Sequence, residues 1–482
     1  MVCLLLIAPA AARADDVSVA PHEDETALLH NPDMGWVLHE NYPVDQRPNG
    51  SSTLLTQPKE NFEGVDHVAV MFSWADLETR ADQYDFAKVD RAYDYWHARG
   101  KQIQLRMSTE SLLYWSALNP PAGMGVPQYL LAKLPATAKQ TRKLDGIEYV
   151  VVDARQALYR QRLEKFLAAV SKHFDDKRPV ALIDLRGFGV WGEWHSGYHY
   201  PSLDEKRAAL CGIIERWSAA FPHHFLAISY SHDPDGPAEY YAGPSDHYDA
   251  AFTSSYADYL CYSALDYAMT RANITLRRDG VGGAVYSNQR RFCDESLATL
   301  AKGPMSCEFV QWYAQAKGGG EKWLDHLLDD ALSLHPNYIN LLGYAGGEAL
   351  AFSREQPRLF ARGLREMGYR LVPTRVSYPP VIRAGESFTI RSTWTNRGVG
   401  RAMRDFHLIV ELSTTSCDAG PVESSKWIRG KVYDVDSKIK FDDLVPGNYT
   451  LRIGLIDGER AIALPLHDGD GRSFPIGWIT VR

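Results

Sequence analysis

A carboxylate stands between two indoles in the middle of the chain, and an imidazole follows directly. These side chains belong to Trp191, Glu193, Trp194 and His195. Aromatic neighbours partly desolvate a carboxyl group and favour its protonated form, so Glu193 is a candidate general acid. The indole faces and the imidazole are suited to holding a sugar ring. The alternative is that both tryptophans only pack at the end of a strand and that Glu193 is an ordinary hydrogen-bonded residue.

A second glutamate, Glu308, lies in a short apolar run further along the chain. Hydrolysis of a glycosidic bond uses two carboxyl groups, one to protonate the leaving oxygen and one to attack the anomeric carbon or activate water. Glu193 and Glu308 are the predicted catalytic pair. Glu348, which follows two glycines, is a rival for the second carboxylate and otherwise a predicted substrate contact.

The elements that have to position this pair are eight short apolar runs. They lie at residues 31–39, 67–73, 102–107, 180–185, 225–230, 283–288, 304–309 and 338–344. Helical spacing separates several of them, at residues 84–97, 154–174, 203–219, 321–334 and 354–367. One helix with loops is expected within residues 246–278. Strands that alternate with helices in this way predict an α/β fold, a (β/α)8 TIM barrel.

The working residues of such a barrel gather at the carboxyl ends of its strands. Six residues with useful side chains fall there: Arg106, Glu193, Tyr230, Tyr286, Glu308 and Tyr344. We expect the tyrosines and Arg106 to contact substrate, Arg106 also to keep the nucleophile ionised, and Tyr286 to hydrogen-bond it. The alternatives are that Arg106 pairs with a core carboxylate and that Tyr286 only packs.

The pattern changes after about residue 371. Runs at residues 388–396, 406–412 and 449–455 alternate polar and apolar side chains with a period of two, and Pro-Gly-Asn and Asp-Gly turns separate strands here. This predicts an antiparallel β-sandwich of immunoglobulin-like scale. The predicted domains are a catalytic barrel at residues 15–370 and a sandwich at residues 371–482.

Residues 1–14 combine a short apolar stretch with Ala12-Arg13-Ala14, which resembles the cleavage site of a signal peptide. We therefore expect a secreted or periplasmic protein, and the pairing of its cysteines stays open. A net charge of -8 offers no basic surface to nucleic acid. No later apolar run approaches the ~18 residues of a membrane span. No cofactor and no metal is expected; a set of His195, His199, His232 and Asp233 is the alternative for a metal.

The stretch Ser73-Trp74-Ala75-Asp76-Leu77-Glu78, followed by Tyr84-Asp85-Phe86 and a helix, is similar to the N-terminal part of barrel glycosidases such as the family 42 β-galactosidases. The clan of these enzymes carries its two glutamates on strands four and seven. The resemblance therefore implies Glu193 as acid/base and Glu308 as nucleophile of a retaining mechanism. The clan also places an asparagine before the acid/base, where this chain has Gly192, and His195 could supply the polar contact instead.

Over most of its length the chain resembles a bacterial family of unknown function. The shared features are Asn-Pro-x-x-Gly-Trp near the start, Trp-Gly-Glu-Trp-His in the middle and a C-terminal sandwich. Together these observations predict a glycoside hydrolase that cleaves an oligo- or polysaccharide with retention. The rival prediction is a carbohydrate-binding or polysaccharide-assembly protein that uses the same barrel mouth without turnover, which Gly192 favours slightly. An esterase or deacetylase is a weaker alternative, since no Gly-x-Ser-x-Gly is present.

Overall fold

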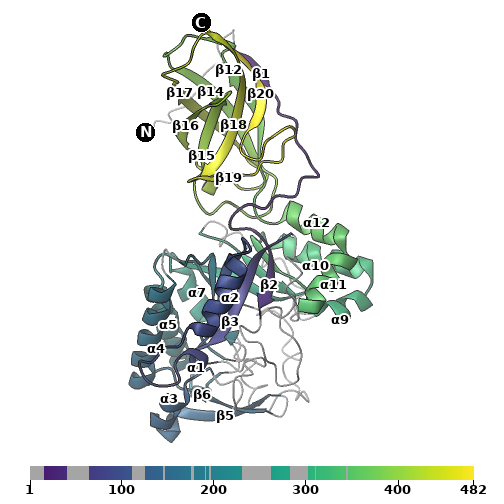
Figure 1. The fold of residues 1–482 in the computed structure, drawn as a ribbon. Coiled ribbons are helices and arrows are strands. Elements are labelled where there is room, and N and C mark those ends of the chain that lie inside the picture. The colour runs from purple at the N-terminus through teal and green to yellow at the C-terminus, as the bar shows by residue number, and fades with distance from the viewer. Residues whose placement is uncertain are drawn as a thin grey trace, which may run out of the picture. The chain divides into compact units, whose positions relative to one another are not determined.

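The computed structural model divides the chain into two compact units. One unit spans residues 33–368, and the other combines the segment before residue 33 with residues 369–482 (Figure 1). The structure describes residues 16–40, 64–110, 125–144, 147–174, 178–189, 192–194, 197–230, 262–282, 302–309, 311–342 and 346–482. The predicted signal peptide at residues 1–14 lies outside the described residues.

The first unit is a closed barrel of eight strands, which confirms the predicted fold class. Every neighbouring pair of strands is parallel. Strands of this kind are covered on both sides, so they appear in the sequence as short apolar runs. In chain order the strands are β2 (Gly35–Glu40), β3 (Val65–Ser73), β4 (Gln102–Ser108), β7 (Leu182–Arg186), β8 (Leu226–Tyr230), β9 (Ile274–Val281), β10 (Ser306–Phe309) and β11 (Tyr338–Asn340).

The prediction of the sixth strand was wrong. The strand between β8 and β10 is β9, which lies before the run at residues 283–288 that was predicted to form it. Residues 283–288 themselves are outside the described residues. β9 has the sequence Ile-Thr-Leu-Arg-Arg-Asp-Gly-Val, whose three consecutive charges are atypical of a buried strand. Within residues 246–278, the expected helix is α7 (Tyr262–Met269).

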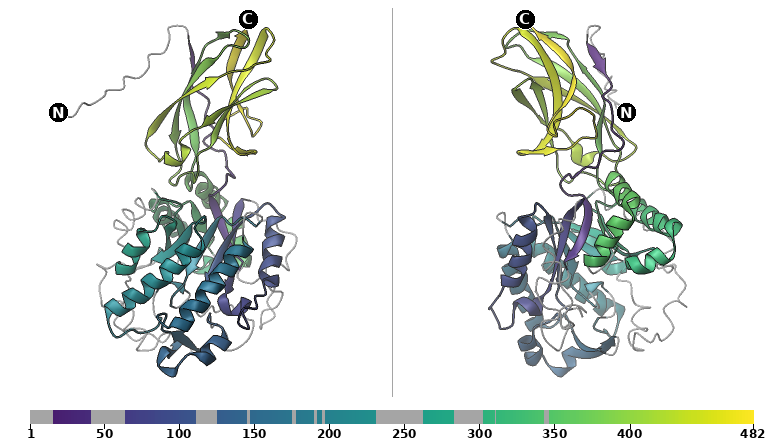
Figure 2. Two further views of the ribbon diagram at one scale, coloured as in Figure 1. Left: turned by 90° about the vertical axis from the view of Figure 1, so that its left-hand side faces the viewer. Right: turned by 45° about the vertical axis from the view of Figure 1, so that its right-hand side comes forward.

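Helices surround the barrel on the outside, as Figure 2 shows. The predicted helix at residues 354–367 is two helices, because Pro357 cannot continue α11 and instead begins α12. An antiparallel hairpin of β5 (Lys139–Leu144) and β6 (Ile147–Val152) precedes α4. The remaining helices of the described part are α1 (Trp74–Leu77), α2 (Ala87–His97), α3 (Gln128–Lys133), α4 (Ala157–His173), α5 (Leu203–Ala220), α9 (Tyr313–Gly318), α10 (Glu321–Ser333), α11 (Gly346–Glu355) and α12 (Pro357–Glu366). No helix among the described residues has the length and apolar character that crossing a bilayer would need.

An apolar cluster fills part of the barrel interior. It contains Val37, Ala69, Leu182, Ala227 and Tyr338, one residue from each of five strands. On β7, the side chains of alternate residues point to the same face of the sheet, so Asp184 and Arg186 follow Leu182 toward the carboxyl ends of the strands. The barrel interior is therefore apolar at one level and charged at the next.

The second unit consists of β-sheets with one short 3-10 helix at Ser424–Lys426. One sheet has the order β1-β12-β14-β17, and the other has the order β13-β20-β18-β15-β16 with β19 beside β18. The strands are β1 (Val17–Val19), β12 (Leu371–Tyr378), β13 (Val381–Ile382), β14 (Phe388–Asn396), β15 (His407–Leu412), β16 (Thr415–Pro421), β17 (Val432–Ile439), β18 (Gly447–Asp457), β19 (Arg460–Ile462) and β20 (Phe474–Val481). β1 pairs antiparallel with β12, so residues 16–32 belong to this unit, although the prediction had assigned them to the barrel.

Candidate active site

A layer of buried charged side chains lies inside the barrel toward the carboxyl ends of the strands. Three arginines and three carboxylates make up this charged layer, which comes from β4, β7, β9 and β10. All six residues are buried. Burial of charges is tolerated only where opposite charges and hydrogen bonds compensate them. The members of the charged layer are Arg106, Asp184, Arg186, Arg277, Asp279 and Glu308.

Glu308 on β10 is held by arginines from three other strands. Its Oε2 accepts a hydrogen bond from Arg106 Nη1 at 2.6 Å and another from Arg277 Nη2, while Arg186 Nη2 lies 3.8 Å away. Burial raises the pKa of Glu308, but the charges of Arg106 and Arg277 outweigh this effect and hold the pKa well below the usual value. Glu308 is therefore an ionised carboxylate.

The two aspartates of the charged layer also pair with Arg186 and Arg277. Arg186 Nε lies 2.8 Å from Asp184 Oδ2, and its Nη2 lies 3.1 Å from Asp279 Oδ2. Arg277 Nε donates to Asp279 Oδ1 at 2.6 Å, and Ser229 Oγ donates to Oδ2 of the same residue at 2.5 Å. Burial raises the pKa of Asp279, yet Arg277 and Arg186 bring it below the ordinary value.

Glu193 follows β7 and reaches the edge of the charged layer. Its Oε1 lies 3.2 Å from Arg186 Nη1 and 4.0 Å from Arg106 Nη2. The side chain of Glu193 is 18% exposed, whereas that of Glu308 is 5% exposed. The structure thus brings Glu193, Glu308 and Arg106 together, with the same two guanidinium groups next to both glutamates.

A tight turn carries Glu193 away from the end of β7. Gly192 and Trp194 both have φ of 69°, a region that L-residues other than glycine rarely adopt. The amide of Gly192 donates to Gly189 O at 3.0 Å, and that of Trp194 donates to Phe188 O at 2.9 Å. A Cβ on Gly192 would lie 2.2 Å from Cβ and 2.7 Å from Cα of Arg186. The asparagine that the resemblance would place at this position therefore does not fit the turn.

Residues at the end of β4 hold this turn from the side. Glu110, which is buried, accepts from the amide of Gly189 at 2.9 Å through Oε2 and from that of Val152 at 3.0 Å through Oε1. The amide of Thr109 donates to Arg186 O at 3.1 Å. The buried carboxylate of Glu110 thus satisfies two main-chain donors and connects the turn to the hairpin.

The indole of Trp194 is buried, and this burial does not support its predicted contact with a sugar. The residue is 3% exposed, and its Nε1 donates to Leu185 O at 3.0 Å. The left-handed backbone at residue 194 accompanies this inward placement. The buried position and the hydrogen bond to Leu185 O agree with packing for Trp194 alone, since Trp191 lies outside the described residues.

Among the described residues, Glu348 makes no hydrogen bond or ion pair with Glu193 or Glu308. It is in the first turn of α11, and its Oε1 accepts from the amide of Ala314 on α9 at 3.4 Å. None of its hydrogen bonds or ion pairs with described residues involves the charged layer. Its predicted role as second carboxylate or substrate contact is therefore not supported by this placement.

Several other predicted contacts cannot be placed. Tyr230 ends β8, but only its main chain is described. The residues outside the described part are Trp191, His195, Tyr286 and Tyr344.

Arg106 contacts Glu308, and its Nε lies 3.5 Å from Asp184 Oδ2, so it pairs with buried carboxylates. Its contact with substrate stays a prediction. Five residues of this region were not predicted from the sequence: Asp184, Arg186, Arg277, Asp279 and His39. The signal that could have found them is the i, i+2 spacing of opposite charges in two strands, Asp184 with Arg186 and Arg277 with Asp279.

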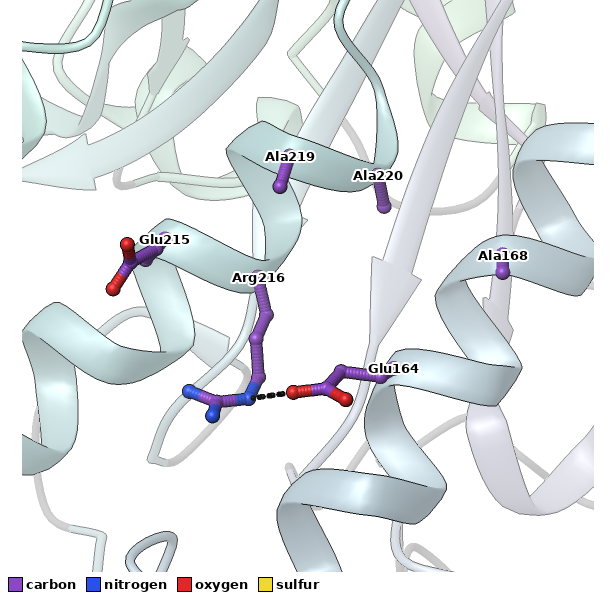
Figure 3. A pocket seen from close by; sticks show the side chains of 6 residues that line it. All are labelled: Glu164, Ala168, Glu215, Arg216, Ala219 and Ala220. Carbon is purple, nitrogen blue, oxygen red and sulfur yellow. Dashed lines mark hydrogen bonds and ion pairs between the residues drawn. The ribbon is translucent and has the colours of Figure 1, made fainter.

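Two further features of the described residues do not join this site. Cys307 on β10 is buried, and its Sγ contacts Ala331 O at 4.0 Å. A groove on the outer helices is lined by alanines and by Arg216, whose Nε donates to Glu164 Oε1 at 2.8 Å (Figure 3). This groove lies between α4 and α5, outside the barrel strands.

Comparison with solved structures finds barrels of carbohydrate-active enzymes at low similarity. The catalytic domain of β-amylase from Paenibacillus polymyxa is 12% identical, with 67% of this chain and 98% of that chain covered and a TM-score of 0.48. The endo-β-1,4-mannanase from Thermotoga petrophila is 10% identical, with 93% and 97% covered and a TM-score of 0.38. No curated protein matches the chain.

Comparison with protein families gives one match that covers the part of the barrel from β3 to β7. This segment contains Arg106 and ends at Arg186, so it supplies two of the three arginines of the charged layer. Over residues 59–186 the chain is similar to the glycoside hydrolase family 42 model, described as beta-galactosidase, and this match supports glycoside hydrolase activity.

Proposed function

We propose that this chain is a retaining glycoside hydrolase that cleaves an oligo- or polysaccharide. Glu308 is the proposed nucleophile and Glu193 the proposed acid/base. The observation that carries the proposal is the ionised carboxylate of Glu308 on the seventh barrel strand, joined through Arg106 and Arg186 to the more exposed glutamate that follows the fourth strand. The family match over residues 59–186 supports the same class of reaction.

The contacts of Glu308 indicate which of its oxygens would react. Within the described part of the barrel, its hydrogen bonds and ion pairs fall on Oε2. Oε1 is therefore the oxygen proposed to form a bond with the anomeric carbon while the glycosidic C–O bond breaks. Glu193 gives its proton to the departing oxygen. Water then attacks the anomeric carbon, Glu193 takes up a proton from it, and the carboxylate of Glu308 is released.

The proposal is tested with a panel of 4-nitrophenyl glycosides and defined polysaccharides, with product anomers followed by proton NMR. We expect hydrolysis with retention, and we expect the Glu193→Gln and Glu308→Gln variants to lose at least about 10³-fold in kcat/KM. Glu164→Gln is the matched control, because Glu164 pairs with Arg216 on the outer helices. Inversion of configuration would refute the retaining mechanism. Loss of activity in Glu348→Gln instead of Glu308→Gln would refute the proposed nucleophile.

A specific observation favours a second candidate, a carbohydrate-binding protein without turnover. The carboxylate of Glu308 is 5% exposed, and guanidinium groups occupy one of its oxygens. Gly192 stands where the resemblance implies an asparagine that would contact the sugar. Binding of a glycan by calorimetry, with no product released by the unaltered protein over long incubation, would decide for this candidate.

A further inference from the structure

Five side chains from five barrel strands form a closed hydrogen-bond ring. Arg106 Nη1 lies 3.0 Å from His39 Nε2 and 2.6 Å from Glu308 Oε2. Asn340 Nδ2 contacts the same nitrogen of His39, and Asn340 Oδ1 accepts from Arg277 Nη1 at 2.9 Å. Arg277 Nη2 closes the ring on Glu308 Oε2.

The chemistry of the ring allows only one direction for its hydrogen bonds. A guanidinium group can only donate, so Arg277 requires the oxygen of the Asn340 side chain and turns the amide nitrogen toward His39. Arg106 and Asn340 then both present donors to Nε2 of His39. This nitrogen has to be the unprotonated one, which makes His39 a neutral imidazole with its proton on Nδ1.

The surroundings of His39 agree with a neutral ring. Its pKa is lowered to about 3, first because burial disfavours the charged form and also because guanidinium groups lie near it, while Glu308 acts in the opposite direction. His39 is buried on β2. A protonated imidazole would present a third donor to Arg106 and Asn340, and the ring would open.

We propose that His39 and Asn340 are positioning residues that hold Arg106 and Arg277 on Oε2 of Glu308, so that Oε1 is fixed as the attacking oxygen. This inference rests on the proposed function. Neither residue is proposed to touch the substrate. They act on Glu308 by fixing the positions of the two arginines. Fixing is needed because other carboxylates lie near enough to attract Arg106. Arg106 lies 3.5 Å from Asp184 through Nε and 4.0 Å from Glu193 through Nη2.

The first test is crystallographic and does not depend on activity. Crystal structures of the unaltered protein, His39→Phe and His39→Gln give the distances from the two guanidinium groups to Glu308 Oε2. We expect at least one arginine to leave Oε2 in His39→Phe and to return in His39→Gln, whose side-chain oxygen can accept both hydrogen bonds. Asn340→Leu opens the ring at a second point and should release Arg277. Both arginines still on Oε2 in His39→Phe or Asn340→Leu would overturn the proposal.

The second test separates positioning from general packing. With the 4-nitrophenyl glycoside that the unaltered protein hydrolyses fastest, we expect kcat of His39→Phe to fall about 100-fold, the order of effect that a misplaced reactive group produces. KM should stay within about threefold, and His39→Gln should recover most of kcat. His67→Phe is the matched control, because His67 is a buried histidine of β3 whose Nε2 lies 3.2 Å from Met34 O, outside the ring.

An unchanged kcat in His39→Phe, or an equal fall in His67→Phe, would refute the positioning role. Failure of the proposed function gives a different result. In that case the unaltered protein hydrolyses no glycoside of the panel, and the crystal structures alone decide whether His39 and Asn340 hold the arginines.

Discussion

Replacing Gly192 by alanine should disturb the candidate site. The glycine has φ of 69°, and an L-residue in this left-handed region is less stable by about 1–2 kcal/mol. The added Cβ would also lie 2.2 Å from Arg186 Cβ. This is far inside van der Waals contact, and Arg186 is itself fixed by the charged layer. Overpacking of this kind costs about 1–3 kcal/mol, so we expect a total loss of about 2–5 kcal/mol.

The barrel offers a control that isolates the backbone part of this loss. Gly100 ends the helical segment before β4 with φ of 74°, and a Cβ there would meet nothing within 4 Å. Gly100→Ala should therefore lose only the backbone term, about 1–2 kcal/mol. The measurement is urea-induced unfolding of the unaltered protein and both variants, with midpoints and slopes compared. The difference between the two variants reports the collision with Arg186.

The same substitution has a functional readout. If Arg186 and the turn separate to make room for the Cβ, then Glu193 moves away from the guanidinium groups, and hydrolysis should fall about 100-fold. Gly100→Ala should leave hydrolysis unchanged. Equal unfolding free energies of Gly192→Ala and Gly100→Ala, or a higher one for Gly192→Ala, would contradict this prediction. The close approach of Gly192 to Arg186 would then be absent in solution.

Three other predictions concern the buried charges and the turn. Glu308 and Asp279 have pKa values below their ordinary ones. The stability that they contribute is therefore full above about pH 4 and is lost as the pH falls further. Melting temperatures measured between about pH 3 and 7 should fall on the acid side, and an unchanged melting temperature there would contradict this. Arg186→Met removes one of the two arginines that pair with both buried aspartates and should lower the unfolding free energy by about 3–5 kcal/mol in urea. Trp194→Phe removes the donor to Leu185 O and should lower the unfolding free energy by about 1–3 kcal/mol. A loss of the same size in the free energy of glycan binding would show instead that Trp194 contacts the sugar.

The barrel was predictable from sequence because seven of its eight strands are apolar runs next to turn residues. Parallel strands are covered on both faces, which removes the polar alternation and leaves a simple signal. Runs such as residues 67–73 and 102–107 coincide with β3 and β4 within two residues. The same regularity placed Glu193 after the fourth strand and Glu308 on the seventh, and so predicted that they meet.

The charged layer was not predictable in this way. Arg277 and Asp279 give β9 the composition of an exposed segment, and the sixth strand was therefore placed too late. The pairing of opposite charges within β7 and β9 shows locally as i, i+2 spacing, but contacts between strands, such as that of Arg186 with Asp279, do not. Those contacts between strands also help to make these residues tolerable inside a barrel.

The directions in which single side chains point could not be predicted from the sequence either. The two indoles around Glu193 indicate an aromatic site only if both face the mouth. Trp194 has a left-handed backbone conformation. Residues other than glycine rarely adopt this conformation, so a tryptophan in the sequence does not predict it. Trp194 consequently packs under Leu185, while its neighbour Glu193 reaches the arginines.

The charge of the site explains why one glutamate is buried and the other is not. In the charged layer, three arginines face three carboxylates, so the layer is neutral when Glu308 is ionised. The proposed mechanism requires a proton on Glu193 when substrate binds, and with that proton the whole site carries no net charge. Once Glu308 has become a glycosyl ester it carries no charge, and Glu193, having given up its proton, supplies the missing negative charge beside Arg186 and Arg106. The total charge inside the barrel is then the same before and after the first step, and no uncompensated charge has to be buried. Of the two glutamates, Glu193 is the more exposed and therefore the more accessible to substrate and water.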